Sequence, residues 1–151
     1  MPLQGQQIWV EPEFPIVDGS AIVYFDAKQC DCPLDHYSGT IYAHTGILRD
    51  NGVWQNVIGS WGDNTAQPQL RPLGDQVYAL DINPSIAEYY NDQIPDEITS
   101  MAFVFRSADG SQQTADLFLD VFQSGQTNII SPKADQIFSL EDTLYVEAVA
   151  L

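Results

Sequence analysis

A group of aromatic residues in the first half of the chain has the clearest chemical meaning in this sequence. Tyr42 and His44 lie two positions apart in residues 40–48, whose β-branched and aromatic residues are typical of a β-strand. Because successive side chains of a strand point to opposite faces, we expect Tyr42 and His44 to share one face. A polar turn then leads to Trp54, with Trp61 close behind. The four residues predict a flat aromatic surface with hydrogen-bonding edges.

A surface of this composition suits a sugar. The C–H face of a pyranose ring packs against an aromatic plane, and the sugar hydroxyls need side chains that donate and accept hydrogen bonds. Tyr42, His44 and Trp54 supply both functions, and Trp61 can extend the surface. The alternative is that the two tryptophans only pack over the ends of the domain and that His44 is an ordinary surface histidine. The residues by themselves leave both interpretations open.

The net charge of the chain narrows the choice of ligand. The sequence contains 21 acidic and 5 basic residues, a formal charge of −16, and the acids are spread along its length. A strongly negative protein repels phosphate backbones and anionic lipids, so neither nucleic acid nor a membrane surface is expected as a partner. Neutral ligands and divalent cations remain. With 44% hydrophobic residues among 151, the chain is expected to fold around a core.

No motif in the sequence indicates an enzyme. It contains no Gly-x-Ser-x-Gly, no His-Glu-x-x-His and no phosphate-binding glycine loop. The acidic residues are numerous enough to supply the carboxylate pair of a glycoside hydrolase. A small β-sandwich, however, usually lacks the deep cleft that this reaction needs. We therefore expect a non-catalytic protein, with no catalytic residues and no cofactor that it must bind.

Calcium is the ion for which the sequence offers ligands. Asp26, Asp31 and Asp35 flank one predicted loop, and Asp109 and Asp116 flank another. Calcium takes clustered oxygen ligands from loops of this kind. The sequence has no Asp-x-Asp-x-Asp-Gly run, and the alternative is that these acids are simply solvated. A structural calcium ion is therefore one of two interpretations of these loops.

The two cysteines, Cys30 and Cys32, are separated by a single residue. In an extended segment their side chains point to opposite faces, which disfavours a disulfide between them. The sequence also lacks a second pair of ligands at a spacing that would suit zinc. We therefore expect two free thiols in a loop.

Short hydrophobic segments separated by turn residues predict an all-β sandwich. The expected strands cover residues 8–10, 20–26, 40–48, 54–57, 76–82, 98–106 and 116–122. The sixth strand contains Met101, Phe103 and Phe105, the most hydrophobic stretch of the chain, and is expected to be an inner strand of the core. One short helix is expected over residues 84–90, with Asn83 as its N-cap.

The last part of the chain differs in character. In the seventh strand the aliphatic residues are expected to face the core, which leaves its phenylalanines on the other face. Two more strand-like segments follow, at 128–138 and 142–151, and two strands alone cannot bury a core. We therefore divide the chain into a domain at 1–124 and, at 125–151, a linker with the truncated start of a following domain. Residues 126–151 are expected to pair outside their own fold, on the phenylalanine face or by exchange in a homodimer.

The motifs around the aromatic residues resemble a known group of modules. The order Ile41-Tyr-Ala-His-Thr-Gly46, a polar turn, Trp54 and then a Phe103-Val-Phe105 strand resembles the starch-binding modules of carbohydrate-binding families twenty-five and twenty-six. Residues 1–123 as a whole resemble an Ig-like module of extracellular bacterial amylase-family enzymes, and the tail resembles the Ig-like domain that tends to follow. The chain departs from those families at the turn that begins with Arg106, where they have a Trp-Asp-Asn-Asn-like sequence.

The resemblance implies a fold, a function and a location. Modules of these families are small Ig-like β-sandwiches of secreted amylases. It implies that Tyr42, His44 and Trp54 bind an α-glucan, such as starch or a maltooligosaccharide, near the catalytic domain of a secreted or cell-surface glycoside hydrolase. The competing interpretation is a structural Ig-like spacer without a ligand, with calcium as a stabilising ion.

Overall fold

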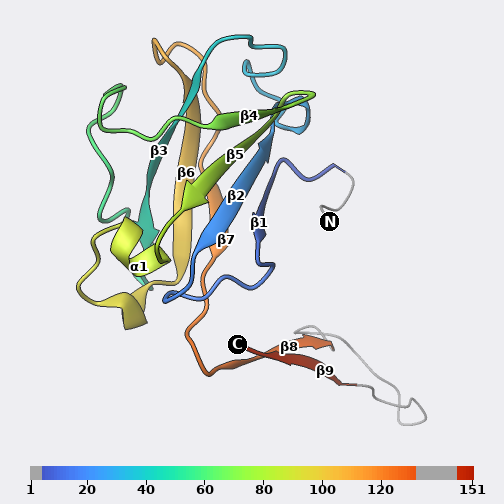
Figure 1. Ribbon diagram of the computed structural model, residues 1–151, viewed down its shortest axis with the longest axis vertical. Coiled ribbons are helices and arrows are strands. Elements are labelled where there is room, and N and C mark those ends of the chain that lie inside the picture. Colours follow the sequence, from blue (N-terminus) through green and yellow to red (C-terminus); the bar gives the residue numbers. More distant parts are fainter. Residues whose placement is uncertain (1–4, 132–145) are drawn as a thin grey trace.

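Seven strands form the body of the structure, a computed structural model that describes residues 5–131 and 146–151 (Figure 1). Their bounds are Ile8–Glu11 (β1), Ala21–Asp26 (β2), Ile41–Leu48 (β3), Arg71–Gly74 (β4), Val77–Ile82 (β5), Ser100–Ser107 (β6) and Leu117–Asp120 (β7). They make one antiparallel sheet in the order β1-β2-β5-β4 and a second in the order β3-β6-β7. This is the strand order of a constant-type immunoglobulin domain. The predicted all-β, Ig-like antiparallel sandwich of about seven strands with one short helix is therefore confirmed.

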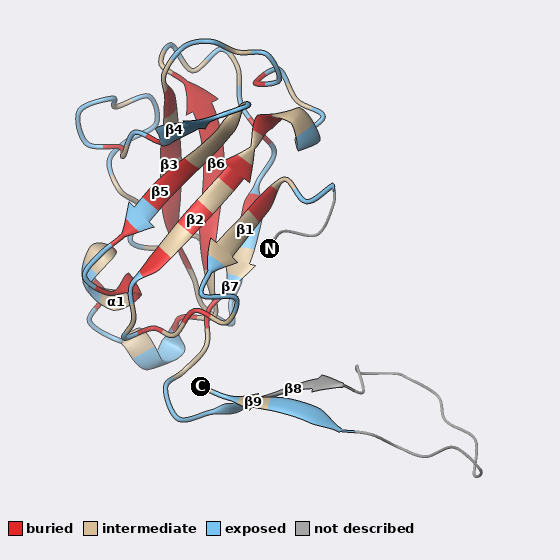
Figure 2. Cartoon of the chain, turned by 45° about the vertical axis from the view of Figure 1, so that its right-hand side comes forward, coloured by how far each residue is buried: buried red, intermediate tan, exposed pale blue. Residues whose placement is uncertain are grey.

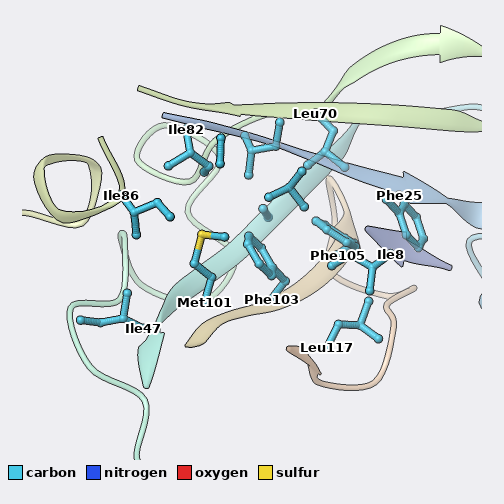
Figure 3. Close-up of a cluster of buried hydrophobic side chains, with 14 of the residues drawn as sticks. Ile8, Phe25, Ile47, Leu70, Ile82, Ile86, Met101, Phe103, Phe105 and Leu117 are labelled. Carbon is cyan, nitrogen blue, oxygen red and sulfur yellow. The ribbon is translucent and has the colours of Figure 1, made fainter. Parts of the chain in front are cut away.

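The core lies between the two sheets and is built from alternate residues of the strands. Figure 2 shows this alternation along β2, where Val23 and Phe25 are buried and Tyr24 between them is only partly buried. Phe25 meets Phe105 of β6 with ring centroids 4.5 Å apart, and this contact joins the two sheets (Figure 3). Met101 and Phe103 are fully buried as well, and β6 is the central strand of its sheet. The prediction that Met101, Phe103 and Phe105 lie in the core is therefore confirmed, and so is the prediction that their strand is an inner strand.

The central strand β6 is buried on both of its faces. Ala102 and Val104, which point away from the core, are also buried. The long connection from β3 to β4 runs along the free edge of β3, and two of its residues, Trp61 and Gln67, contact Arg106 of β6. Backbone hydrogen bonds hold it there: the N–H of Ala43 donates to the carbonyl of Pro68 and the N–H of Ile58 donates to the carbonyl of Thr45, both at 2.9 Å.

One predicted strand is absent, and one strand of the structure was not predicted. Residues 54–57 do not form a strand: Gln55 makes one isolated bridge to Ile47, and Asn56 takes a left-handed φ of +49°. The fourth strand is instead β4, in a segment whose prolines disfavour a central strand. β4 lies at the edge of its sheet, where Pro72 is tolerated because an edge strand needs hydrogen-bond partners on one side only.

The α-helix of the described residues, α1 (Ile86–Tyr89), is shorter than predicted. Its N-cap is Ser85, whose Oγ accepts a hydrogen bond from the backbone N–H of Glu88 at 3.2 Å. The prediction of Asn83 as the cap is therefore wrong, and the Ser-x-x-Glu capping box was the better signal. Two 3-10 helices, Ala27–Gln29 (η1) and Pro95–Glu97 (η2), complete the helical content of the described residues. None of these described helices is long and apolar enough to cross a membrane.

Cys30 and Cys32 form a disulfide, so the prediction of two free thiols is wrong. The prediction assumed an extended segment, and the segment is not extended. It begins with η1, Cys30 then has right-handed helical backbone angles, and Asp31 takes a left-handed φ of +46°. This reversal brings the two Cα atoms within 5.1 Å of each other, which is inside the range that a disulfide spans.

The tail begins and ends with two strands, β8 (Thr127–Ser131) and β9 (Glu147–Ala150), that pair with each other in antiparallel fashion. Phe118 on the phenylalanine face of β7 stays 49% exposed, so the described part of the tail does not cover this residue, and exchange with a second copy stays a prediction. The aliphatic residues of this region, Leu117 and Val121, face the core as predicted. The strand-like residues 132–145 lie outside the described part of the chain. A homodimer through residues 126–151 and the domain boundary at 124 remain predictions.

Deletion of residues 126–151 is expected to leave a folded and soluble monomer, because the buried cluster of the described chain runs from Ile8 to Val121. Sedimentation velocity of the full and the shortened chain tests this. Exchange of the tail gives a dimer for the full chain only. A full chain that sediments as a monomer contradicts the exchange, and a shortened chain that unfolds contradicts the independence of the core.

Candidate functional site

Four residues form an aromatic cluster on the outer face of the β3-β6-β7 sheet: Tyr42, His44, Trp54 and Trp61. His44 is at its centre. Its ring stacks on Trp54, with centroids 5.5 Å apart and an angle of 25°, and meets Trp61 at 5.1 Å and 70°. Trp61 is 48% exposed, and the other three side chains are partly exposed. The structure thus brings together all four residues that the sequence singled out.

Strand alternation places the first two members of the cluster. Along β3, Ile41, Ala43 and Thr45 are buried, whereas Tyr42 and His44 between them are partly exposed. The predicted sharing of one face by Tyr42 and His44 is therefore confirmed.

A tight turn after β3 places Trp54. The N–H of Gly52 donates to the carbonyl of Arg49 at 2.9 Å, with a left-handed φ of +66° at Gly52. The chain then runs back beside β3, where Gln55 and Ile47 exchange backbone hydrogen bonds. This return needs a glycine at position 46, because a Cβ there would lie 2.7 Å from the carbonyl oxygen of Gln55.

The loop that carries Trp61 is held by its own polar residues. The Asp63 carboxylate accepts hydrogen bonds from the backbone N–H groups of Thr65 and Ala66, at 2.9 and 3.1 Å. The side-chain amide of Asn64 donates to the carbonyl of Ala108 at 2.8 Å, which ties the loop to the turn after β6. The segment that follows Trp61 is therefore anchored, although the ring of Trp61 is itself half exposed.

A buried arginine lies beneath the cluster. Arg106 is 0% exposed, and its guanidinium carbon lies 5.2 Å from the ring centroid of Tyr42 and 6.0 Å from that of Trp61. Among the described basic residues, Lys28, Arg49 and Arg71 each pair with a carboxylate, whereas Arg106 does not. Two aromatic faces and the carbonyl of Ser107, which accepts from Nη1 at 3.0 Å, take the place of a carboxylate.

Sequence reasoning identified Arg106 only as a departure from the starch-binding families, and it missed Gln67. Gln67 is 3% exposed and bridges the two halves of the site. Its Oε1 accepts from Nε of Arg106 at 2.7 Å, and its Nε2 lies 2.7 Å from Nδ1 of His44. One signal was available for Arg106: a lone basic residue near the end of the most hydrophobic segment of an acidic chain. In the structure it lies directly opposite Tyr42 in the register.

The environment of His44 disfavours its charged form. Burial lowers the pKa of His44 from its ordinary value of 6.5, the positive charge of Arg106 lowers it further, and Asp116 acts in the opposite direction. The imidazole is therefore neutral at neutral pH. The aromatic cluster then presents ring faces and neutral polar edges, without a net charge of its own.

Two of the five acidic residues predicted for calcium, Asp26 and Asp109, have other roles in the structure. Asp26 accepts from the N–H of Lys28 at 3.0 Å and caps η1. Asp109 accepts from the hydroxyls of Ser107 and Ser111, at 2.6 and 2.8 Å, and these hydrogen bonds lower its pKa to about 2. Among the residues that the structure describes, no three His, Cys, Asp or Glu side chains come together in a group that could hold a metal ion.

No protein-family model matches this chain, and no curated protein matches it either.

Proposed function

We propose that this protein is a non-catalytic carbohydrate-binding module that holds an α-glucan, such as starch or a maltooligosaccharide, near the catalytic domain of a glycoside hydrolase. The observation that carries the proposal is the arrangement of the aromatic cluster. Trp54 and Trp61 lie at different angles to His44 on one exposed face. A curved glucan chain offers successive sugar faces at an angle to each other, and two rings set at an angle match it.

The charge of the site and of the chain also favours a neutral sugar. His44 is neutral, and Arg106 is buried, so the cluster offers a ligand no accessible positive charge. The chain carries a formal charge of −16, which repels anionic polysaccharides. The ligand groups that the site can still bind are neutral hydroxyls and the C–H faces of sugars.

A secreted or cell-surface location belongs to the same proposal. The disulfide between Cys30 and Cys32 supports it, because disulfides persist in oxidising compartments and are rare where thiols are kept reduced.

The second candidate is a structural Ig-like spacer without a ligand. The observation that favours it is that the rings of the cluster already contact each other, with His44 between Trp54 and Trp61. In that case the packing of these rings stabilises the connection from β3 to β4 and has no other role.

Affinity electrophoresis separates the two candidates. We expect native gels cast with soluble starch to retard the protein relative to gels without polysaccharide, because binding to the immobile polymer removes protein from the moving band. The high negative charge gives fast migration in the absence of a ligand, so a small retardation is readable. Equal mobility in both gels, across a range of starch concentrations, contradicts α-glucan binding and favours the spacer.

A further inference from the structure

A chain of hydrogen bonds runs beneath the aromatic cluster from Arg106 through Gln67 to His44. Nε of Arg106 lies 2.7 Å from Oε1 of Gln67, and Nε2 of Gln67 lies 2.7 Å from Nδ1 of His44. Arg106 and Gln67 are buried, so little water is available to exchange with these contacts. The only member that reaches the surface is the imidazole.

The donors and acceptors of this chain have a single consistent arrangement. A guanidinium group has only N–H donors, so the atom of Gln67 that faces it must be the acceptor Oε1. The opposite orientation of the amide would place its NH₂ group against the N–H of Arg106. With Oε1 fixed toward Arg106, the NH₂ group of Gln67 faces His44. Nδ1 of His44 must then accept a hydrogen bond, and it carries no proton.

We infer that Arg106, acting through Gln67, holds His44 in the neutral tautomer with its proton on Nε2, so that the imidazole presents one N–H donor at the aromatic cluster. Arg106 and Gln67 are positioning residues in this arrangement, since neither reaches the surface. The ligand group that meets His44 is an acceptor oxygen, a hydroxyl or ring oxygen of a neutral sugar. That last step rests on the proposed function, whereas the tautomer does not.

The groups around His44 oppose its protonation. A proton on Nδ1 would face the NH₂ group of Gln67, and the imidazolium would lie near the buried charge of Arg106. Trp54 and Trp61 pack against the ring and shield it from water. Among the described charged groups, Asp116, from the segment before β7, acts in favour of protonation. Together these groups keep His44 neutral, with its proton on Nε2, as the pH falls to the range in which a free histidine takes up a proton.

The first test uses nitrogen-15 NMR of the imidazole in the protein without any ligand, over a range of pH. The chain has two histidines, so His36→Gln assigns the signals; the His36 side chain is exposed and its removal does not touch the cluster. We expect the Nε2–H tautomer for His44 and a titration midpoint below 6.5. The Nδ1–H tautomer, or a mixture of both, overturns the inference.

The second test replaces the bridging amide with a carboxylate of the same shape. In Gln67→Glu the carboxylate accepts from Arg106 and also from a protonated Nδ1 of His44, so the pKa of His44 is expected to rise by about one unit or more. Gln69→Glu is the matched control, because it adds the same charge at an exposed position two residues away. Equal pKa values of His44 in Gln67→Glu and Gln69→Glu overturn the relay. If Gln67→Glu does not fold, the tautomer of His44 in the wild-type protein still tests the inference.

Binding of maltoheptaose to the same variants tests the sugar contact separately. Above the raised pKa of His44 we expect Gln67→Glu to bind about tenfold or more weakly than Gln69→Glu, because the proton of the neutral imidazole then lies on Nδ1, where the carboxylate accepts it, and Nε2 has no proton to donate. A wild-type protein with the inferred tautomer that does not bind starch refutes the proposed function and leaves the relay intact. Binding with the opposite tautomer refutes the relay and leaves the function intact.

Discussion

Phe103→Ala is expected to lower the free energy of unfolding by about 3–5 kcal/mol, the range for removal of a fully buried phenylalanine. Phe103 is 0% exposed on the central strand of its sheet, and its ring stacks with Phe105 at 5.7 Å. Strands on both sides of β6 restrict any collapse of the cavity. Urea denaturation monitored by tryptophan fluorescence measures the loss, with the slope of the transition as a check on two-state behaviour.

Phe118→Ala is the matched control for this prediction. Phe118 lies in the neighbouring strand β7, opposite Ala102 in the register, but its side chain is 49% exposed. Its truncation is expected to cost less than about 1 kcal/mol. Equal losses for the two substitutions contradict the assignment of the inner and outer faces of this sheet.

The sequence predicted most of the sandwich because local periodicity and global fold agree in its inner strands. In β2 and the first half of β3 the alternation of side chains points to one buried face, and β6 is recognised by its continuous hydrophobic run. The expected fold class was therefore correct, because seven short strands joined by turns favour a sandwich.

The errors occurred where tertiary contacts outweigh local preference. Residues 54–57 have strand-like composition, but the turn at Gly52 lets only Gln55 pair with β3. Arg71–Gly74 has two poor strand formers and becomes a strand because the edge of β5 accepts it. The disulfide depends on a left-handed residue, Asp31, which no hydrophobic pattern can reveal.

The surface residues of the candidate site could be predicted from the sequence, but the buried residues that hold them in place could not. Tyr42 and His44 follow from alternation in one strand, and Trp54 follows from the turn beside it. Gln67 and Arg106 are 39 positions apart and belong together only because the long connection folds over β6. A polar residue whose partner lies so far along the chain gives no local signal, so reasoning from a single sequence finds the aromatic surface and misses the network beneath it.

Trp54→Ala is expected to weaken the binding of maltoheptaose by about 1–3 kcal/mol, a factor of roughly 5 to 150, as the loss of an aromatic anchor commonly does. The indole stacks on His44 and is partly exposed, so its removal takes away a surface on which a sugar can stack. It also removes one of the two rings that pack against the imidazole. Isothermal titration calorimetry measures the change, and thermal unfolding shows whether the domain remains folded.

Trp9→Ala is the control that distinguishes binding from packing. Trp9 lies on β1 in the opposite sheet, is also partly exposed, and stacks on Tyr24 with centroids 5.2 Å apart. Both substitutions remove an indole from a stacked pair on the surface of a sheet, so both are expected to lower stability by a similar amount. Only Trp54→Ala is expected to lower the affinity for the oligosaccharide. A loss of stability in both variants, with unchanged affinity in both, means that Trp54 packs over the sheet as Trp9 does, and the spacer is then the correct interpretation.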